Sequence, residues 1–159
     1  MTAHSIFKMK KGIIHIITTI LLLTASACTQ NHGYIGRLFG SWYLYEMTCD
    51  GEAVDIAQYG DAFWSFQSNL IVITIEYDHH CVSKSYGTWT ETDDNLILDF
   101  SYTYEHGSLE DAYEPPVWMG LVKKPDNVLH YLEKSGKSML LRFTDADGKV
   151  FEYYFRKTY

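Results

Sequence analysis

The sequence predicts an all-β fold, an antiparallel up-and-down β-barrel of eight to ten strands that follows an N-terminal signal segment. Two observations support this prediction. Short apolar or alternating stretches recur about every ten residues, with turn dipeptides such as Asp50-Gly51 between them, a pattern typical of sandwiches and barrels. Most connections are tight, so neighbouring strands should pair side by side and close into a barrel. A Greek-key sandwich would need several long crossings, and only two connections are long.

The first 27 residues have the layout of a bacterial signal peptide. Three lysines precede an apolar run at 12–23, which is too short to span a bilayer, and small residues follow at 25–27. Cys28 comes next, so the stretch resembles a lipoprotein signal, in which cleavage before the cysteine is followed by its acylation, although Ala25 stands where leucine is commonest. The alternative is an ordinary secretory signal. The predicted organisation is a lipoprotein signal peptide at 1–27, a lipid-anchored tether at 28–36 and a barrel domain at 37–159.

The mature chain would be strongly acidic. Cleavage after residue 27 removes three of the 13 basic residues and none of the 20 acidic ones, so ten basic and 20 acidic residues leave a net charge of −10. Such a chain is a poor partner for nucleic acid or for anionic lipid head groups. We expect no nucleic-acid partner and contact with the membrane through the N-terminal lipid alone.

The expected location is the bacterial cell envelope, at the outer membrane. In lipoproteins of the kind that the signal resembles, an acidic run after the cysteine is associated with surface export. Thr29-Gln30 shows no such run, which favours the periplasmic side.

The expected strands follow one another in a regular series. The strand expected at 70–77 begins with the run 70–75, which is β-branched almost throughout. Gly87, inside another strand, suits a bend at a barrel corner. If the first and last strands pair with their ends together, the number of strands must be even. Nine are expected, so either the residues after Gly51 add a short tenth arm or one expected strand is not separate. The nine are 37–48, 62–67, 70–77, 84–91, 96–103, 117–123, 128–133, 139–144 and 150–157.

The many aromatic side chains on these strands have two interpretations. A small barrel needs large side chains simply to fill its interior, whereas a cavity among them would take an apolar or amphipathic small molecule. In the second case the acidic and aromatic stretch Tyr104–Pro116, which ends in a proline pair that no strand can contain, would form the mouth. The candidate ligand-binding residues are Trp64, Phe66, Leu98, Phe100, Tyr102, Tyr113, Trp118 and Leu141.

No motif for catalysis stands out. The chain has no Gly-x-Ser-x-Gly elbow and no phosphate-binding loop, so we expect neither an enzyme nor a cofactor. The nearest approach to a metal site is Asp78-His79-His80-Cys81, but adjacent strand residues point to opposite faces, and no metal site is expected. Cys49 and Cys81 lie near expected strand ends. Two unpaired thiols are the default expectation, and a disulfide between them is possible outside the cytoplasm.

Two short motifs at opposite ends of the domain resemble a known family. Gly40-Ser41-Trp42 opens the first strand and Arg156 lies near the end of the last. This combination resembles the calycin pattern of lipocalins and fatty-acid-binding proteins, and the whole layout is similar to the short lipocalin-like lipoproteins common in Bacteroidetes. The resemblance implies that Gly40, Trp42 and Arg156 close one end of the barrel, with the arginine stacked over the indole.

The resemblance also implies a function. A lipocalin-like lipoprotein would be anchored in the membrane and would hold a small hydrophobic or amphipathic ligand in its barrel. The alternative is a non-catalytic interaction or accessory module, with a filled barrel, that docks an envelope protein through its loops.

Overall fold

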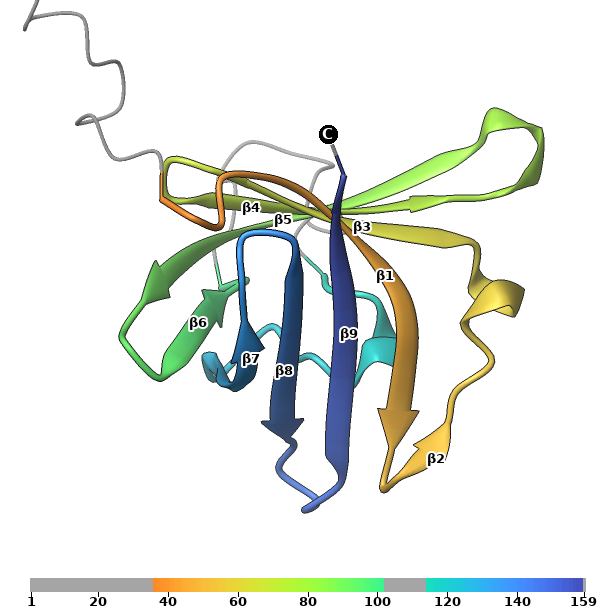
Figure 1. The fold of residues 1–159 in the computed structure, drawn as a ribbon. Coiled ribbons are helices and arrows are strands. Elements are labelled where there is room, and N and C mark those ends of the chain that lie inside the picture. The colour runs from red at the N-terminus through yellow and green to blue at the C-terminus, as the bar shows by residue number, and fades with distance from the viewer. Residues whose placement is uncertain (1–35, 102–113, 159) are drawn as a thin grey trace, which may run out of the picture. The chain divides into compact units, whose positions relative to one another are not determined.

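Eight strands close into an antiparallel barrel in the computed structural model, which describes residues 36–101 and 114–158 (Figure 1). Each strand of the ring pairs with its neighbour in sequence, and β1 also pairs with β9, which closes the ring. The predicted up-and-down barrel is therefore confirmed. The strands are β1 (Gly40–Cys49), β2 (Glu52–Ala53), β3 (Asp61–Gln67), β4 (Leu70–Glu76), β5 (Val82–Glu91), β6 (Asn95–Asp99), β7 (Asn127–Lys134), β8 (Ser138–Thr144) and β9 (Val150–Thr158).

The even number of strands in the ring has two structural causes. The arm after Gly51 forms β2, which pairs only with the end of β1 and stays outside the ring. The expected strand at 117–123 is wrong, because Val117–Met119 forms a 3-10 helix, η5. Pro116 precedes η5, and Gly120 ends it with a φ of 73°, so both flanking residues favour a turn over an extended strand. A short apolar run does not by itself distinguish these two states.

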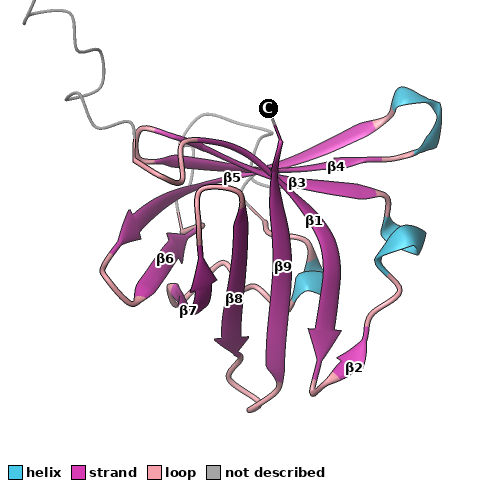
Figure 2. Ribbon diagram, viewed as in Figure 1, coloured by secondary structure: helices cyan, strands magenta, loops and turns pink. Residues whose placement is uncertain are grey.

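Helical structure in the described residues is limited to single turns (Figure 2). Besides η5, these are η2 (Ile56–Tyr59), which follows β2, and η3 (Asp78–His80) in the β4–β5 connection. Among the described residues, no helix has the length and apolar character needed to cross a membrane.

The barrel interior is built from alternate residues of the strands. In β3 and β4 the pattern is strict: Trp64 and Phe66 are fully buried, as are Ile71 and Ile73. Gly87 is needed at its position, because a Cβ there would lie 2.7 Å from the Phe100 ring and from the Asp99 carbonyl oxygen. The glycine lets two strands approach closely around a large aromatic side chain.

A β-bulge in β1 changes which residues face inward. The pairing of β1 with β9 shifts register between Leu44 and Glu46. Strict alternation from Trp42 would place Glu46 inside, but the extra residue turns Glu46 outward and puts Met47 in the core. A bulge therefore lets one long strand keep apolar side chains inside along its whole length.

Cys49 and Cys81 are both free, so the possible disulfide between them is not formed in the structure. Cys49 is the last residue of β1, whereas Cys81 follows η3 in the connection between β4 and β5. Figure 1 shows this connection extending well away from the end of β1. A disulfide needs Cα atoms about 4.4–6.8 Å apart, and the two elements bring these residues to different parts of the molecule.

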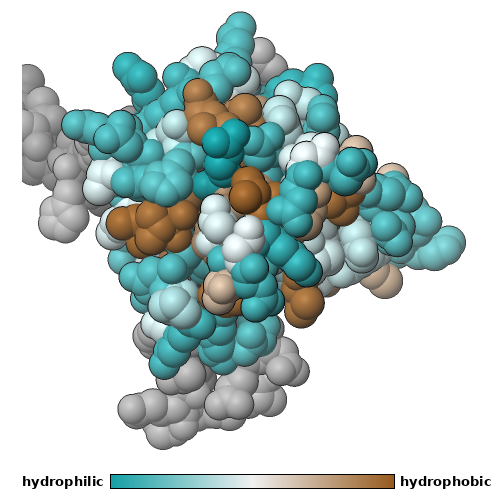
Figure 3. All heavy atoms as spheres, turned by 90° about the horizontal axis from the view of Figure 1, so that it is seen from below, coloured by the Kyte–Doolittle hydropathy of each residue, from teal (hydrophilic) through white to brown (hydrophobic). Residues whose placement is uncertain are grey.

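The face of the molecule that is seen from below is mostly hydrophilic (Figure 3). On this face, apolar residues form small separate patches between polar ones (Figure 3). Scattered apolar side chains are normal on a soluble domain, so these patches require no partner to explain them.

Candidate functional site

One end of the barrel, here called the Trp42 end, is closed by residues that flank and begin β1. Trp42 is 1% exposed, and its Nε1–H donates a 2.8 Å hydrogen bond to the Leu38 carbonyl oxygen. The Lys157 ammonium lies 5.2 Å from the centre of the Trp42 ring and donates a 2.9 Å bond to the Arg37 carbonyl oxygen. A cation over a buried indole therefore joins the first and last strands of the barrel.

The cation at this end is Lys157, so the expected contact between Arg156 and Trp42 is wrong. Buried Tyr153 and Phe155 set the alternation in β9, which directs Lys157 inward and Arg156 outward. Arg156 is exposed, and its guanidinium carbon lies 5.2 Å from the centre of the Tyr45 ring. Extending the alternation of β9 by one residue could have shown this from the sequence.

Most of the predicted ligand-binding residues lie inside the barrel. Trp64 is close to two aromatic rings of β9, with centroid distances of 4.7 Å to Phe155 and 5.5 Å to Tyr153. Tyr102 and Tyr113 lie outside the described residues. The predicted residues that are fully buried in the interior are Trp64, Phe66, Leu98, Phe100 and Leu141.

Two indole groups at the interior have no hydrogen-bond acceptor. The Nε1 atoms of Trp64 and Trp89 are buried and unpartnered among the described residues. The two are linked by Phe66, which follows Trp64 on the same face of β3 and packs edge-on against Trp89 at 5.5 Å. A buried donor without a partner is uncommon and costs about 1–3 kcal/mol. The interior thus offers two unused donors in an aromatic environment.

The opposite end, here called the Met119 end, is covered by the segment 115–122. Tyr153 O–H donates a buried 2.6 Å hydrogen bond to the Met119 carbonyl oxygen, and burial raises the pKa of Tyr153 well above its ordinary value. A Cβ on Gly120 would lie 2.4 Å from the Phe151 ring, so the segment packs directly on the first inward residue of β9. This carbonyl and this ring fix the position of the segment.

Two further contacts hold the segment at its flanks. The buried Asn127 side chain accepts a 2.8 Å bond from the Val122 amide and donates a 2.7 Å bond to the Val122 carbonyl oxygen. Trp118 stacks on Tyr59 of η2, with centroids 4.7 Å apart and planes 3° from parallel. Trp118 is half-buried in this stack, so it covers the barrel at this end, and most of the expected mouth at 104–116 lies outside the described residues.

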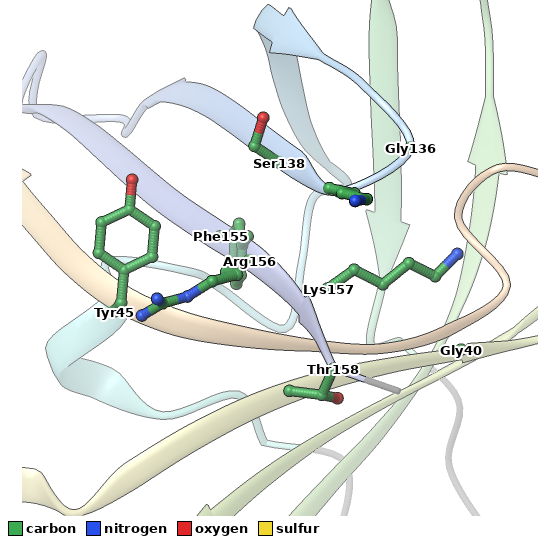
Figure 4. A pocket seen from close by; sticks show the side chains of 9 residues that line it. Gly40, Tyr45, Gly136, Ser138, Phe155, Arg156, Lys157 and Thr158 are labelled. Atoms are coloured by element: carbon green, nitrogen blue, oxygen red, sulfur yellow. The ribbon is translucent and has the colours of Figure 1, made fainter.

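A pocket of about 860 Å³ lies beside the Trp42 end (Figure 4). It is bounded by the start of β1, the turn between β7 and β8, and the last residues of β9. None of the eight predicted ligand-binding residues lines it. Its lining residues are Gly40, Tyr45, Gly136, Lys137, Ser138, Phe155, Arg156, Lys157 and Thr158.

The polar groups of the described residues show no arrangement for metal binding. No three histidine, cysteine, aspartate or glutamate side chains among them are close enough to hold an ion. The pKa of Tyr43 is raised by partial burial and by its bond to Asp61, and that of Tyr154 by its bond to Glu152. These phenols remain protonated donors, which suits structural hydrogen bonds.

The eight-strand meander, closed by β1 against β9 around a buried Gly-x-Trp tryptophan, defines a lipocalin-like barrel. A family model described as a lipocalin-like domain matches residues 21–158, and the chain belongs to this family. No protein in a search of curated proteins matches it.

Solved structures from two Bacteroides species share the fold. A lipocalin-like protein from Bacteroides uniformis is 17% identical with a TM-score of 0.52, over 77% of this chain and 100% of that one. An uncharacterized protein from Bacteroides eggerthii is 20% identical with a TM-score of 0.53, over 76% of this chain and 99% of that one. At these identities the likeness shows the fold alone.

Proposed function

We propose that this chain is a non-catalytic lipoprotein of the bacterial cell envelope, anchored through Cys28, whose barrel binds a small hydrophobic or amphipathic ligand. Membership of the lipocalin-like family supports ligand binding in general terms. The order of lysines, apolar run, small residues and Cys28 supports the anchor. The periplasmic face of the outer membrane is the favoured location.

The observation that carries the ligand proposal is the unpartnered indole N–H of Trp64. Trp64 is fully buried beside Tyr153 and Phe155, and its donor has no acceptor among the described residues. In a solid core, an apolar ring at this position would be more stable than an indole, because burial of a donor without an acceptor costs free energy. A ligand with an apolar body and one acceptor oxygen would satisfy the donor while contacting the aromatic rings.

The Met119 end is the proposed entrance to the interior. The Trp42 end is formed by the strands that close the ring, whereas the segment 115–122 is held by a few side-chain contacts, among them the bond from Tyr153 to Met119. Opening that segment leaves all strand pairs of the barrel intact.

A pair of ligands that differ only in an acceptor oxygen tests the ligand proposal. Tetralone has a carbonyl oxygen and tetralin has none, and each is titrated by tryptophan fluorescence and by displacement of phenylnaphthylamine. We expect tetralone to bind roughly two- to tenfold more tightly, the range for one hydrogen bond. Trp64→Phe should abolish the preference and retain tetralin binding.

Tyr43→Phe is the matched control for this substitution. It also removes one donor from an aromatic ring, but on the outside of the barrel, where Tyr43 bonds to Asp61. The control should keep the preference for tetralone. Binding of neither compound by the folded wild-type protein would contradict the proposal.

The anchor is tested by fractionation of cells that produce the full chain. The wild-type protein should incorporate labelled palmitate and sediment with membranes, and Cys28→Ala should do neither. Membrane sedimentation of the Cys28→Ala variant would point to an attachment other than a lipid on this cysteine.

The alternative function is a filled barrel that docks an envelope protein through its loops. The observation in its favour is that side chains or crossing segments cover both ends of the barrel, with Met119 and Trp42 almost fully buried. Specific capture of one membrane protein by the wild-type chain, without any effect of Trp64→Phe, would favour this alternative.

A further inference from the structure

We propose a second binding site, in the pocket beside the Trp42 end, for a small amphipathic anion: a carboxylate, sulfate or phosphate group on an apolar body. The pocket volume of about 860 Å³ falls in the range of sites that hold drug-sized molecules. Neither Trp64 nor Trp89 lines this pocket, so the inference does not depend on ligand binding in the barrel interior.

The pocket concentrates positive charge in an acidic protein. Lys137, Arg156 and Lys157 all line it, although the whole chain has a formal net charge of −7. The ion pairs within the described residues use other cations: Lys123 with Glu114, Lys134 with Glu91, and Arg142 with Glu152. The three pocket cations have no carboxylate partner in that part of the chain.

Two of the three cations are available to a ligand. Lys157 already donates to the Arg37 carbonyl oxygen and covers Trp42, so its role is to close the barrel. The Arg156 guanidinium contacts the Tyr45 ring and takes part in none of the ion pairs of the described residues, so its N–H donors can bind an oxygen of a ligand. Lys137 lies in the β7–β8 turn and is exposed.

The positions of Arg156 and Lys137 are set by the backbone. The Lys157 amide donates a 2.9 Å bond to the Lys137 carbonyl oxygen, which ties the β7–β8 turn to the end of β9. Figure 4 shows the Arg156 side chain directed towards Tyr45 and Lys157 extending the other way along the pocket. The anion-binding groups would therefore come from a turn and a strand that are hydrogen-bonded to each other.

Among the described residues, two carboxylates lie next to the lining of the pocket without forming part of it. Glu133 accepts a 2.6 Å bond from the Ser138 hydroxyl at the pocket wall. Glu46 is exposed and acts on Tyr154, whose pKa it helps to raise. Neither residue lines the pocket, so the charge inside it remains positive.

The remaining lining suits an apolar body. Tyr45 is 43% exposed and offers a ring face that Arg156 already covers in part. A Cβ built on Gly136 would have no atom within 4 Å, so the turn leaves open space above the strands. An apolar group can occupy this space while the anion reaches Arg156.

The experiment compares anilinonaphthalene sulfonate with its uncharged parent, phenylnaphthylamine, by fluorescence titration of the full mature chain. We expect the sulfonate to bind with an affinity that falls as salt increases, because exposed cations are screened. Arg156→Met and Lys137→Met should each weaken sulfonate binding about tenfold, the scale of a charge-assisted contact, and leave phenylnaphthylamine binding unchanged. Arg156→Lys should retain part of the affinity.

The control is Arg142→Met, which removes an outward-facing arginine from neighbouring β8 that is paired with Glu152 and lies outside the pocket. It should not change sulfonate binding. Equal binding of the two probes, or sulfonate binding that survives the double variant of Arg156 and Lys137, would overturn the proposal.

The anionic group could also belong to a membrane lipid. Flotation with vesicles of phosphatidylcholine, with and without phosphatidylglycerol, separates this source from a monomeric ligand. Binding of the sulfonate in the absence of vesicles supports the proposal. Association with phosphatidylglycerol vesicles alone, without binding of the monomeric probe, would overturn it. The preference for tetralone depends on Trp64, which does not line the pocket. The outcome of that experiment therefore does not decide whether the pocket binds the sulfonate.

Discussion

The two ends of the barrel are closed in different ways. At the Trp42 end the closing groups belong to the strands that complete the ring, or directly precede them: Trp42 lies in β1, Lys157 in β9, and Leu38 just before β1. At the Met119 end, a separate segment between β6 and β7 lies over the core and is held by side chains such as Tyr153. The first closure is lost only when strand pairing is lost, whereas the second can open locally.

The largest expected effect is that of Trp42→Ala. Removal of a fully buried indole and its bond to Leu38 should lower the free energy of unfolding by about 3–5 kcal/mol. Urea denaturation measures the change. Trp118→Ala, at the half-buried Tyr59 stack of the other end, should cost clearly less. Equal losses of unfolding free energy would show that the two ends contribute equally to the stability of the barrel.

Gly120→Ala should have the next largest effect. The new Cβ would overlap the Phe151 ring, and the backbone φ of 73° already disfavours a side chain. We expect a loss of about 2–4 kcal/mol and faster entry of tetralone, measured by stopped-flow fluorescence. Gly148→Ala is the matched control, because its φ of 84° is similar but no atom lies within 4 Å of the added carbon. A loss no greater than that of the control would contradict tight packing of the segment on β9.

Tyr153→Phe should cost about 1–2 kcal/mol, because it leaves the buried Met119 carbonyl oxygen without its partner. Hydrogen exchange should rise in residues 115–122 before it rises in the strands. Uniform exchange across the whole barrel would argue against local opening.

The same variant should alter stability at high pH. Burial raises the pKa of Tyr153 above its ordinary value of 10.0, so the folded state favours the protonated phenol more strongly than the unfolded state does. Its contribution is complete below about pH 10 and is lost as the pH rises above that value. The free energy of unfolding of the wild-type protein should therefore fall above pH 10 more steeply than that of Tyr153→Phe. Parallel curves would contradict this role of the phenol.

The smallest effect separates the two neighbouring cations of β9. Lys157→Met should cost about 0.5–1 kcal/mol, the worth of a partly exposed cation over an indole, whereas Arg156→Met should change stability by less than about 0.5 kcal/mol. Thermal denaturation of both variants measures the difference. A larger loss of stability from Arg156→Met than from Lys157→Met would show that Arg156, and not Lys157, closes this end of the barrel.

Some features of the fold and the site could be predicted from local chemistry. Residues 71–75 are all β-branched, and the stretch is flanked by turns, so it forms a strand in almost any context. Gly87 was expected at a bend, and its lack of a side chain does admit Phe100. The inward positions of Trp64 and Phe66 follow from alternation alone.

Other features depend on contacts between distant residues. Three of these features reflect how one segment fits against another. They are the free thiols of Cys49 and Cys81, the 3-10 turn at Val117–Met119, and the bulge between Leu44 and Glu46. The pocket at Lys137 and Arg156 combines a turn and a strand that no local pattern connects.

The sequence by itself determined that the chain forms a closed antiparallel barrel with a buried Trp42, because side-chain alternation and tight turns are local properties. Alternation along β9 already points Lys157 inward and Arg156 outward. Only the tertiary structure decided that Lys157 covers Trp42, that Arg156 shares a pocket with Lys137, and that Met119 covers the opposite end. Those outcomes depend on register, and a shift of one residue turns a side chain to the other face of the sheet.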